Sequence, residues 1–419
     1  MARSDTRWSA PPSLPFLHSQ PMPDTDRPGR PVADFDRLRR WPDVEAPNLF
    51  AVDASDRLIL DEASIAVAAA PARTVVAIND HYGALAIGAA VSLGATGVRV
   101  FQDALVREVA LAANARGVTT EVESLPLGAE LLTGATVVLL QMPRSLAELD
   151  EIAGEIARWA DPSVVVFAGG RIKHLTLTMN GVLAKHFGRL DVSLARQKSR
   201  VLIAREPLAT ESAFPVREYN EELGLWVCAH GAVFAGAKLD LGTRLLLSVL
   251  DGALADARTA IDLGSGTGIL AASIARLRPT ITVIATDQSA AAVSSSRATL
   301  TANGLGDRVS VVRDDGLKSQ PDASADLIML NPPFHVGSTV YTGLADRMFR
   351  DAARVLRPGG ELWTVYNSHL AYRPTLQSVI GSTREVVRNT KFTVAASRRR
   401  GGAPSGEDNL SRLDSSSER

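Results

Sequence analysis

The sequence predicts an α/β protein with two domains, each built around a largely parallel β-sheet. Short apolar runs of strand length alternate with helix-length segments through both halves of the chain, which is typical of βαβ units. A chain of 419 residues is also too long for one ordinary core, and two domains suit its length. The plan of the first half recurs in the second, which indicates one fold used twice; two unrelated α/β domains are the alternative.

The composition is that of a globular cytoplasmic protein. Hydrophobic residues make up 46% of the chain and charged residues 22%, and no apolar run approaches the roughly 20 residues of a membrane span. The amino terminus lacks the pattern of a secretory signal, and the single cysteine, Cys228, cannot form an internal disulfide. The net charge of −1 argues against a uniformly basic nucleic-acid binder. We therefore expect a cytoplasmic monomer that uses neither a membrane nor a metal.

Residues 1–47 are rich in proline and show no sustained hydrophobic period, so we expect most of this segment to be disordered. Only residues 32–38 are expected to dock on the folded part. Residues 48–225 then form the first predicted domain. Its strands are expected at 74–78, 97–101, 135–140 and 163–168, and its helices at 83–93, 103–116 and 146–159.

Residues 226–400 form the second predicted domain, and residues 401–419 a disordered tail. The expected strands are 258–263, 281–286, 308–312, 327–330 and 361–366, and the expected helices are 268–277, 289–303 and 342–356, the last stopped by Pro358-Gly359-Gly360. In the alignment of the two halves, Ile78-Asn-Asp80 corresponds to Ile261-Asp-Leu263, and Leu140-Gln-Met-Pro143 to Leu330-Asn-Pro-Pro333. The first copy keeps only Gly83 in its first turn, so we expect it to have lost its ligand.

The stretch from Asp326 to His335 ends an apolar run in an amide, two prolines and an aromatic ring. Neither proline can continue the hydrogen-bond ladder, so the strand that begins near Asp326 must stop at Asn331. The carboxyl ends of the strands form the ligand crevice of an open α/β sheet. Asn331 and Phe334 are therefore expected at the rim of that crevice, on short, stiff backbone that suits a flat group.

A glycine loop leads from the first strand of the second domain into its first helix. Its glycines, Gly264, Gly266 and Gly268, let the backbone approach a ligand at the amino end of the helix. A dinucleotide fingerprint requires glycine at the next position, where Ile269 stands, and this disfavours a nicotinamide cofactor.

Acidic residues follow the next two strands. Asp287 ends the second strand, where a carboxylate accepts both hydroxyls of a ribose. Asp314 and Asp315 follow the third strand and would place an acceptor near the amino group of an adenine. Three aspartates at successive strand ends favour a nucleoside-containing cofactor.

These motifs together resemble the class I S-adenosylmethionine-dependent methyltransferases, and specifically the bacterial ribosomal RNA guanine-N2 methyltransferases of the small and large subunits. The resemblance covers roughly residues 48 to 400 and is carried by Asp262 to Leu270, Asp287, Asp315, Asn331-Pro-Pro-Phe-His335, Lys238-Leu-Asp-Leu-Gly242, Ala298 to Gly304 and Tyr366-Asn-Ser-His-Leu370. Ser265 stands where that family usually has Cys, and Asp314-Asp315 replaces a pair that is often amide-bearing.

The resemblance implies two tandem Rossmann-like methyltransferase domains, of which the amino-terminal one is degenerate and binds or supports RNA, and the carboxy-terminal one is catalytic. It implies S-adenosylmethionine as cofactor and ribosomal RNA or a ribosomal subunit as partner. The residues assigned to the cofactor are Asp262, Gly264, Gly266, Gly268, Asp287, Asp314, Asp315 and Asn331, and those assigned to catalysis are Asn331, Pro332, Pro333 and Phe334.

The exocyclic N2 of guanine is a poor nucleophile because its lone pair is conjugated with the ring. If Asn331 Oδ1 and the Pro332 carbonyl each accept one N–H, the lone pair is localised towards the methyl group. Phe334 is expected to stack on the base after it leaves its helix. His335 could take up the released proton or only pack, and we favour packing.

Three other functions remain open from the sequence. A methyltransferase with the same rim can act on a protein glutamine amide or on adenine N6. A non-catalytic RNA-binding assembly factor would suit the degenerate first half, although the intact loop from Gly264 to Gly268 counts against it. An oxidoreductase is disfavoured by Ile269.

A local excess of positive charge lies between Arg171 and Arg205. Eight basic residues stand there against one acid, Asp191, which gives 8 − 1 = +7. We expect this end of the first domain to bind phosphates, chiefly through Arg196, Lys198 and Arg200, with the run Arg398-Arg-Arg400 as the alternative.

Overall fold

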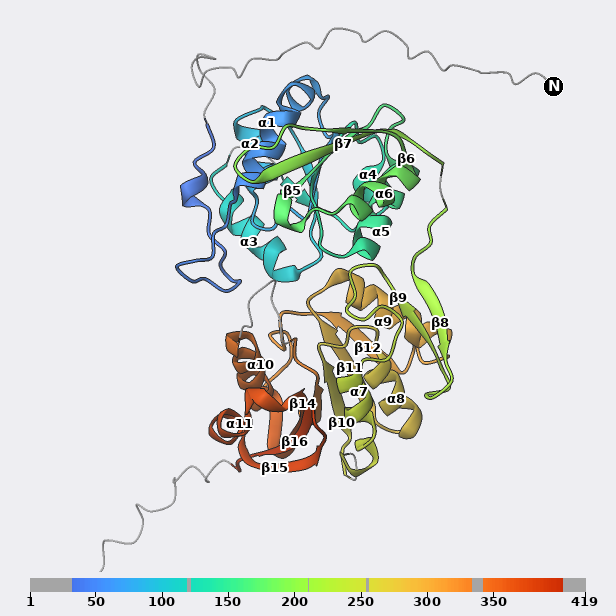
Figure 1. The fold of residues 1–419 in the computed structure, drawn as a ribbon. Helices are drawn as coiled ribbons and strands as arrows, with labels where there is room; N and C mark the ends of the chain where they lie inside the picture. Colours follow the sequence, from blue (N-terminus) through green and yellow to red (C-terminus); the bar gives the residue numbers. More distant parts are fainter. Residues whose placement is uncertain (1–31, 119–121, 210, 254–255, 334–341, 402–419) are drawn as a thin grey trace, which may run out of the picture. The chain divides into compact units, whose positions relative to one another are not determined.

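The computed structural model describes residues 32–118, 122–209, 211–253, 256–333 and 342–401. The predictions for residues 1–31, for Phe334 and His335 and for residues 402–419 lie outside these ranges. Within the described part, the chain forms two seven-stranded sheets and one two-stranded hairpin (Figure 1). No helix there combines the length and apolarity needed to span a membrane.

The first sheet has the strand order β3-β2-β1-β4-β5-β7-β6. Its first five strands are parallel, and β7 runs antiparallel to both of its neighbours. The strands are β1 Val75–Ile78, β2 Val98–Phe101, β3 Val122–Ser124, β4 Val137–Gln141, β5 Val165–Arg171, β6 Phe187–Val192 and β7 Ser199–Pro207. The helices are α1 Ala54–Ala69, α2 Ala84–Val91, α3 Leu105–Ala115, α4 Ala129–Leu132, α5 Leu146–Trp159 and α6 Leu177–His186, with short 3-10 turns at η1 Phe35–Arg37 and η2 Ile172–His174.

The second sheet has the order β12-β11-β10-β13-β14-β16-β15, again with five parallel strands and an antiparallel pair at one edge. Its strands are β10 Thr259–Leu263, β11 Thr282–Asp287, β12 Val309–Arg313, β13 Ala325–Leu330, β14 Leu356–Asn367, β15 Gly381–Arg388 and β16 Phe392–Arg399. The helices are α7 Leu241–Leu247, α8 Ile269–Leu277, α9 Ala290–Ala302, α10 Thr342–Val355 and α11 Arg373–Val379, with 3-10 turns at η3 Leu250–Ala253 and η4 Ser368–Leu370. The hairpin β8 Val216–Asn220 and β9 Leu225–Ala229 precedes this sheet in the chain.

Each sheet is covered by helices on both faces (Figure 1). In the first domain α1 and α2 pack on one face, and α4, α5 and α6 on the other. In the second domain α7, α8 and α9 pack on one face, and α10 and α11 on the other. Strands buried on both faces read as continuous apolar runs, and every residue of β1 and β4 is buried. The predicted fold class, two tandem Rossmann-like domains, is therefore confirmed.

The identical strand order confirms that one fold is used twice, but the register corrects the alignment of the two halves. Ile78 pairs with Leu140 across β1 and β4, and Leu263 pairs with Leu330 across β10 and β13. Ile78 thus corresponds to Leu263, two residues beyond the Ile261 to which the sequence comparison had matched it. In this alignment Gly83 corresponds to Gly268, because Gly83 lies five residues after Ile78 and Gly268 lies five residues after Leu263.

Two predictions about segments at element boundaries were wrong. Residues 39–47, expected to be disordered, are folded against the first domain: Asp43 accepts a hydrogen bond from the Tyr82 hydroxyl at 2.7 Å, and the Arg40 guanidinium lies 4.5 Å from the centre of the Tyr82 ring. Helix α10 is not stopped by Pro358-Gly359-Gly360. It ends at Val355, and strand β14 begins at Leu356 and includes these three residues.

Candidate active site

The glycine loop between β10 and α8 has a backbone that alternates into the left-handed region. The φ angles are 74° at Gly264, 55° at Gly266 and 76° at Gly268. The loop is fixed from behind, because the N–H of Gly264 donates to Thr286 O at 2.8 Å and the Ser296 hydroxyl donates to Gly266 O at 3.0 Å. A Cβ added at Gly266 would meet no atom within 4 Å, whereas one at Gly268 would lie 3.0 Å from Ser296 Cα. The loop therefore leaves open space at Gly266 for a ligand.

Asp262 lies beneath this loop and is fully buried. Its Oδ2 accepts the N–H of Ala271 in the first turn of α8 at 3.0 Å, and its Oδ1 has no hydrogen-bond partner among the described residues. Burial raises the pKa of Asp262 to about 7. Asp262 therefore holds the loop and the helix together, and its predicted contact with the cofactor stays a prediction.

Asp287 ends β11 beside the open part of the loop. Its Oδ2 accepts the N–H of Gly266 at 3.0 Å, and its Oδ1 accepts the N–H of Ser289 at 2.9 Å. Each oxygen of a carboxylate has two lone pairs, so both oxygens keep capacity for a ligand hydroxyl. Burial raises the pKa of Asp287 above its usual value, against the two backbone donors that lower it. This geometry suits the two hydroxyls of a ribose.

Asp314 and Asp315 follow β12, and both are buried. Asp314 Oδ2 accepts the N–H and the hydroxyl of Ser319 at 2.9 and 2.7 Å. Asp315 lies between two cations: its Oδ1 is 2.8 Å from the Arg347 guanidinium and its Oδ2 is 2.5 Å from Lys318 Nζ. A contact of Asp315 with an adenine amino group would have to compete with these partners, so it stays a prediction.

Asn331 follows the last residue of β13, as the two prolines after it predicted. Its Nδ2 donates to Asp240 Oδ2 and to Thr243 Oγ1, each at 3.0 Å. Its Oδ1 is buried and has no partner among the described residues. Two acceptors on the nitrogen side fix which way the amide points. The side chain therefore presents an unused acceptor, which is what a planar N–H donor in the crevice requires.

The two prolines differ in exposure: Pro332 is buried and Pro333 is exposed. Phe334 lies outside the described residues, so its stacking role stays a prediction. Among the described residues, no cluster of three or more His, Cys, Asp or Glu side chains is arranged to hold a metal ion.

The first domain keeps the shape of the loop but fills it with side chains. The φ angles of Asn79, His81 and Gly83 are 56°, 62° and 102°, so the left-handed alternation of Gly264, Gly266 and Gly268 is retained. Gln102, which stands where Asp287 stands in the second domain, accepts the N–H of His81 at 2.9 Å and donates to His81 O at 3.0 Å. The side chain of Gln102 thus holds both the N–H and the carbonyl of His81, and Asn79 and His81 carry side chains at positions where the second domain has glycine.

Asp240 and Thr243 are site residues that the sequence reasoning did not assign. The segment from Lys238 to Gly242 was recognised as part of the family resemblance, but no role followed from it. In the structure Asp240 caps α7 by accepting the N–H groups of Gly242 and Thr243 at 2.9 and 3.0 Å, and the same oxygen holds Asn331. An Asp before a helix is a capping signal that the sequence shows. The additional hydrogen bond of Asp240 to Asn331 has no such sequence signal.

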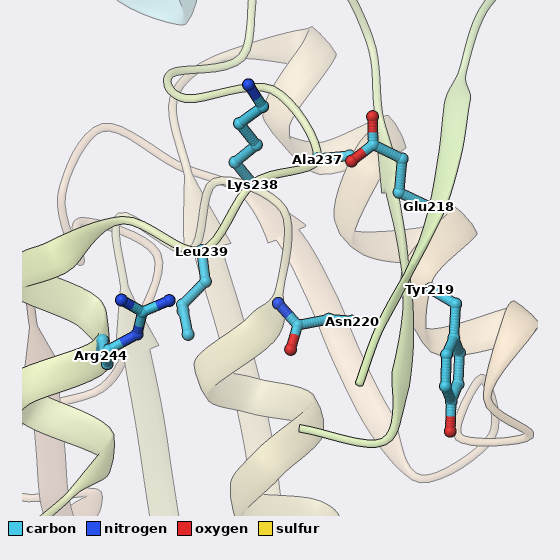
Figure 2. Close-up of a pocket in the computed structure, with 7 residues that line it drawn as sticks. All are labelled: Glu218, Tyr219, Asn220, Ala237, Lys238, Leu239 and Arg244. Carbon is cyan, nitrogen blue, oxygen red and sulfur yellow. The ribbon is translucent and has the colours of Figure 1, made fainter. Parts of the chain in front are cut away.

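A separate pocket of about 330 Å³ is lined in part by the segment that carries Lys238 (Figure 2). It is lined by Glu218, Tyr219, Asn220, Ala237, Lys238, Leu239 and Arg244. None of the predicted cofactor-binding residues lines it, so we do not assign the cofactor to this pocket.

Comparisons with known proteins match both domains. A family described as "RLMG N-terminal domain" matches residues 32–208, and one described as "Methyltransferase small domain" matches residues 224–396. The chain is 35% identical over 369 residues to the ribosomal RNA large subunit methyltransferase G of Pseudomonas paraeruginosa, which covers 87% of this chain and 97% of that relative. It is 32% identical over 374 residues to the protein of the same name from Streptomyces coelicolor, covering 85% and 96%.

A solved structure has the same fold over most of the chain. It is described as the T. thermophilus 16S rRNA N2 G1207 methyltransferase (RsmC) in complex with AdoMet and guanosine. The TM-score is 0.66 at 21% sequence identity, and the match covers 85% of this chain and 97% of that one. At this level of identity the likeness supports the arrangement of two tandem domains.

Proposed function

The chain belongs to the ribosomal RNA large subunit methyltransferase G family, and we propose that it transfers a methyl group from S-adenosylmethionine to the exocyclic N2 of a guanine in large-subunit ribosomal RNA. The observation that carries this proposal is the side chain of Asn331. Its nitrogen is held by Asp240 and Thr243, and its buried Oδ1 is left without a partner among the described residues at the end of β13. An exocyclic amine with two N–H groups is the donor that such an acceptor fits.

The cofactor is assigned to the second domain. Gly264, Gly266 and Gly268 would admit the cofactor against the backbone, and Asp287 would accept its two ribose hydroxyls. Asp262 supports the loop from below.

The chemistry rests on orientation rather than on a strong base. Bound S-adenosylmethionine supplies an electrophilic methyl group on sulfur. Asn331 Oδ1 would accept one N–H of the guanine amine, and the Pro332 carbonyl the other, which localises the nitrogen lone pair towards that methyl group. The methylated nitrogen then has to release one of its protons, which can pass to water. Because Asp240 and Thr243 prevent the Asn331 amide from turning over, the acceptor is in place before the base arrives.

We assign the binding of RNA phosphates to a basic cluster at the carboxyl edge of the first sheet. This cluster is defined by Arg107, Arg144, Arg171, Lys173 and His174. Arg144 Nη2 lies 3.5 Å from His174 Nε2. Burial and the neighbouring charges of Arg144, Lys173 and Arg171 lower the pKa of His174. Among the described residues, the four cations of this cluster have no acidic partner within ion-pair distance. Unpaired cations are available to bind phosphates.

Half of the eight basic residues between Arg171 and Arg205 are paired with acids in the folded protein, and most of these acids lie outside that sequence interval. Arg196 lies 3.2 Å from Asp61 and 3.4 Å from Glu62, both on α1. Lys185 pairs with Asp150, and Arg189 and Arg205 share Asp191. The local excess of +7 is therefore reduced but not abolished, and Arg171 and Lys173 of this interval belong to the basic cluster at the sheet edge. Lys198 and Arg200 remain exposed, but the basic cluster at the sheet edge is the stronger candidate.

The test is methyl transfer from labelled S-adenosylmethionine to large-subunit RNA, small-subunit RNA, assembled subunits and total protein, assayed in parallel. We expect label in large-subunit RNA, released after nuclease digestion as N2-methylguanosine. Label in N6-methyladenosine or in protein glutamine would replace the proposed substrate by one of the two alternatives. Cofactor binding without transfer to any of these would favour the assembly-factor function.

A further inference from the structure

The two copies of the fold meet in a reciprocal backbone contact. Ala104 and Ser289 form an isolated antiparallel bridge, and these residues occupy the same place in the two domains, two positions after Gln102 and Asp287. The N–H of Leu105 donates to Gln288 O at 3.0 Å, and the N–H of Ala290 donates to Asp103 O at 2.8 Å. Each domain thus supplies a carbonyl to the first residue of the other domain's helix.

The side-chain contacts, unlike the backbone contacts, are not reciprocal: a side chain of the first domain contacts the second domain without an equivalent in return. Asp103 Oδ1 accepts the Ser289 hydroxyl and the N–H of Ala291, both at 2.9 Å. Gln288, the counterpart of Asp103, makes no such return contact: its Oε1 is buried without a partner among the described residues. An acidic side chain of the first domain therefore caps helix α9 of the second, where a negative charge is favourable.

A salt bridge holds the same contact from the other side. The Arg313 guanidinium, at the end of β12, lies 2.7 Å from Glu108 on α3. It also donates to the carbonyls of Gln102 and Asp103, each at 2.9 Å. The main chain at Asp103 is therefore fixed independently of its carboxylate, so a substitution of this side chain leaves the domain contact in place.

The cap leads directly to the ribose-binding carboxylate. Ser289 gives its hydroxyl hydrogen to Asp103, accepts the N–H of Ala292 at 3.1 Å, and donates its own N–H to Asp287 Oδ1 at 2.9 Å. We propose that Asp103, in the domain that has lost its own cofactor, is a positioning residue for the cofactor site of the other domain. It orients Ser289, and Ser289 orients Asp287. This inference rests on the proposed cofactor and adds a function for the first domain besides RNA binding.

The test compares S-adenosylmethionine affinity, measured by calorimetry without RNA, in the full chain and three variants. Asp103→Ala removes the cap, and we expect its dissociation constant to rise about fivefold, equivalent to about 1 kcal/mol. Asp103→Asn keeps an oxygen for both donors, and we expect it to stay within about twofold of the wild type. Ser289→Ala removes the hydroxyl that donates to Asp103 but keeps the backbone N–H that donates to Asp287, and we expect the same loss as for Asp103→Ala.

The matched control is Glu151→Ala, which breaks a different contact between the domains. Glu151 binds His230 Nδ1 at 2.5 Å and the N–H of Gly231 at 2.7 Å, neither of which leads to Asp287. We expect this variant to lose thermal stability but to keep the wild-type cofactor affinity. An equal loss of affinity in Glu151→Ala, or wild-type affinity in folded Asp103→Ala, would overturn the positioning role. If Asp103→Ala does not fold, wild-type affinity in Ser289→Ala overturns it.

The kinetic pattern separates positioning from a general loss of activity. At saturating cofactor, Asp103→Ala should keep the wild-type kcat and show only a raised KM for S-adenosylmethionine, because Asn331 and its partners are unaffected. A kcat loss at unchanged KM would contradict the inference. Failure of the wild type itself to bind S-adenosylmethionine would instead overturn the proposed cofactor, and the positioning role with it.

Discussion

Asn331 Nδ2 and Asp240 Oδ2 lie 3.0 Å apart, and this contact ties the rim of the crevice to the start of α7. The same carboxylate oxygen accepts two backbone N–H groups at the helix start, and these hold Asp240 in place. Rotation of the Asn331 amide would therefore break its hydrogen bond to Asp240. The direction of the Asn331 amide is thus set by a helix cap that is remote in sequence. Catalysis at this rim therefore depends on the Asp240 cap of α7 as well as on the Asn331 amide.

Asn331→Ala should reduce kcat about 100-fold to 1,000-fold, the usual range for loss of a group that stabilises developing charge. Affinity for S-adenosylmethionine should remain, because the loop and Asp287 are unchanged. Single-turnover methylation of large-subunit RNA measures the first quantity, and calorimetry with the cofactor measures the second. If cofactor affinity disappears together with activity, the assigned role of Asn331 is wrong.

Thr243→Val should lower kcat about tenfold. The substitution removes one of the two acceptors that hold the Asn331 nitrogen, and a hydrogen bond contributes about 0.5–1.5 kcal/mol. Thr243→Ser keeps the hydroxyl and should retain the wild-type rate. Equal rates in the two variants would show that Asp240 alone fixes the amide.

Much of the fold was predictable because its central strands are continuous apolar runs between helices with clear periods. The bounds of α5, Leu146–Trp159, were predicted to the residue, helped by a Ser145 cap whose hydroxyl accepts the N–H of Glu148. The antiparallel edge strands were missed because half-exposed strands such as β6 and β15 carry mixed polar sequence without a simple alternation. Helix α1 was missed although Asp53 and Asp56 form a capping box at its start.

The candidate site was predictable where one short segment carries it. The glycine loop, Asp287 and Asn331 could be located from local motifs, because each stands at the end of a strand. The hydrogen bond from Asn331 to Asp240 and the cap that Asp103 places on α9 join residues far apart in sequence. Contacts of that kind depend on how the elements pack, and no local pattern encodes them.

Asp287→Asn should weaken S-adenosylmethionine binding, because a carboxylate that accepts two hydroxyls makes charge-assisted hydrogen bonds of about 1.5–3 kcal/mol each. We expect a loss of about tenfold or more in affinity, with kcat at saturating cofactor less affected. Asp262→Asn is the matched control: its carboxylate is fully buried and contacts the helix rather than the crevice, so its effect should be on thermal stability. An unchanged dissociation constant in Asp287→Asn would remove this residue from the site.

Cofactor affinity should also depend on pH through Asp287. Burial raises the pKa of this carboxyl above its usual value, so the empty site keeps the proton to a higher pH than a free carboxyl does. The stability that this form contributes to the empty protein is present below the ordinary pKa and is lost as the pH rises through the raised one. Binding of ribose hydroxyls requires the ionised form, so affinity should fall as the pH is lowered through the raised pKa.

Calorimetry between about pH 8 and about pH 5 tests this dependence. The affinity of the wild type and that of Asp287→Asn are compared at each pH. Because the titration of the ligand affects both proteins equally, it cancels in the difference. That difference should shrink towards acid pH. A difference that is constant across the range would mean that Asp287 does not titrate in the free site.

The chain should bind one molecule of S-adenosylmethionine. The loop of the first domain has the left-handed backbone of a cofactor loop, but Gln102 hydrogen-bonds His81 at both its N–H and its carbonyl. The side chains of Asn79 and His81 also stand where the second domain has Gly264 and Gly266. Calorimetry should therefore give one site per chain, and Asp287→Ala should weaken that one site. Two sites in the wild type, or a full-affinity site remaining in Asp287→Ala, would contradict the degenerate character of the first domain.

RNA binding should depend on the basic cluster and much less on Arg196, Lys198 and Arg200, the residues first favoured by sequence. Reversing Arg144, Arg171 and Lys173 to Glu removes cations that lie at the carboxyl edge of the first sheet without acidic partners among the described residues. We expect a higher KM for RNA and unchanged affinity for S-adenosylmethionine. The slope of log K against log salt should flatten by about 0.9 for each phosphate that the variant no longer neutralises, so by up to about 3.

The matched control reverses Arg196, Lys198 and Arg200, which changes the net charge by the same amount. Arg196 already pairs with Asp61 and Glu62, so its positive charge is compensated in the folded protein. This triple variant should keep a KM for RNA and a salt slope near those of the wild type, with some loss of thermal stability from the new repulsion with α1. Since both triple variants carry the same net charge, a nonspecific charge effect would change the KM for RNA and the salt slope equally in both. A larger effect in the control than in the basic-cluster variant would return the RNA-binding surface to Arg196, Lys198 and Arg200.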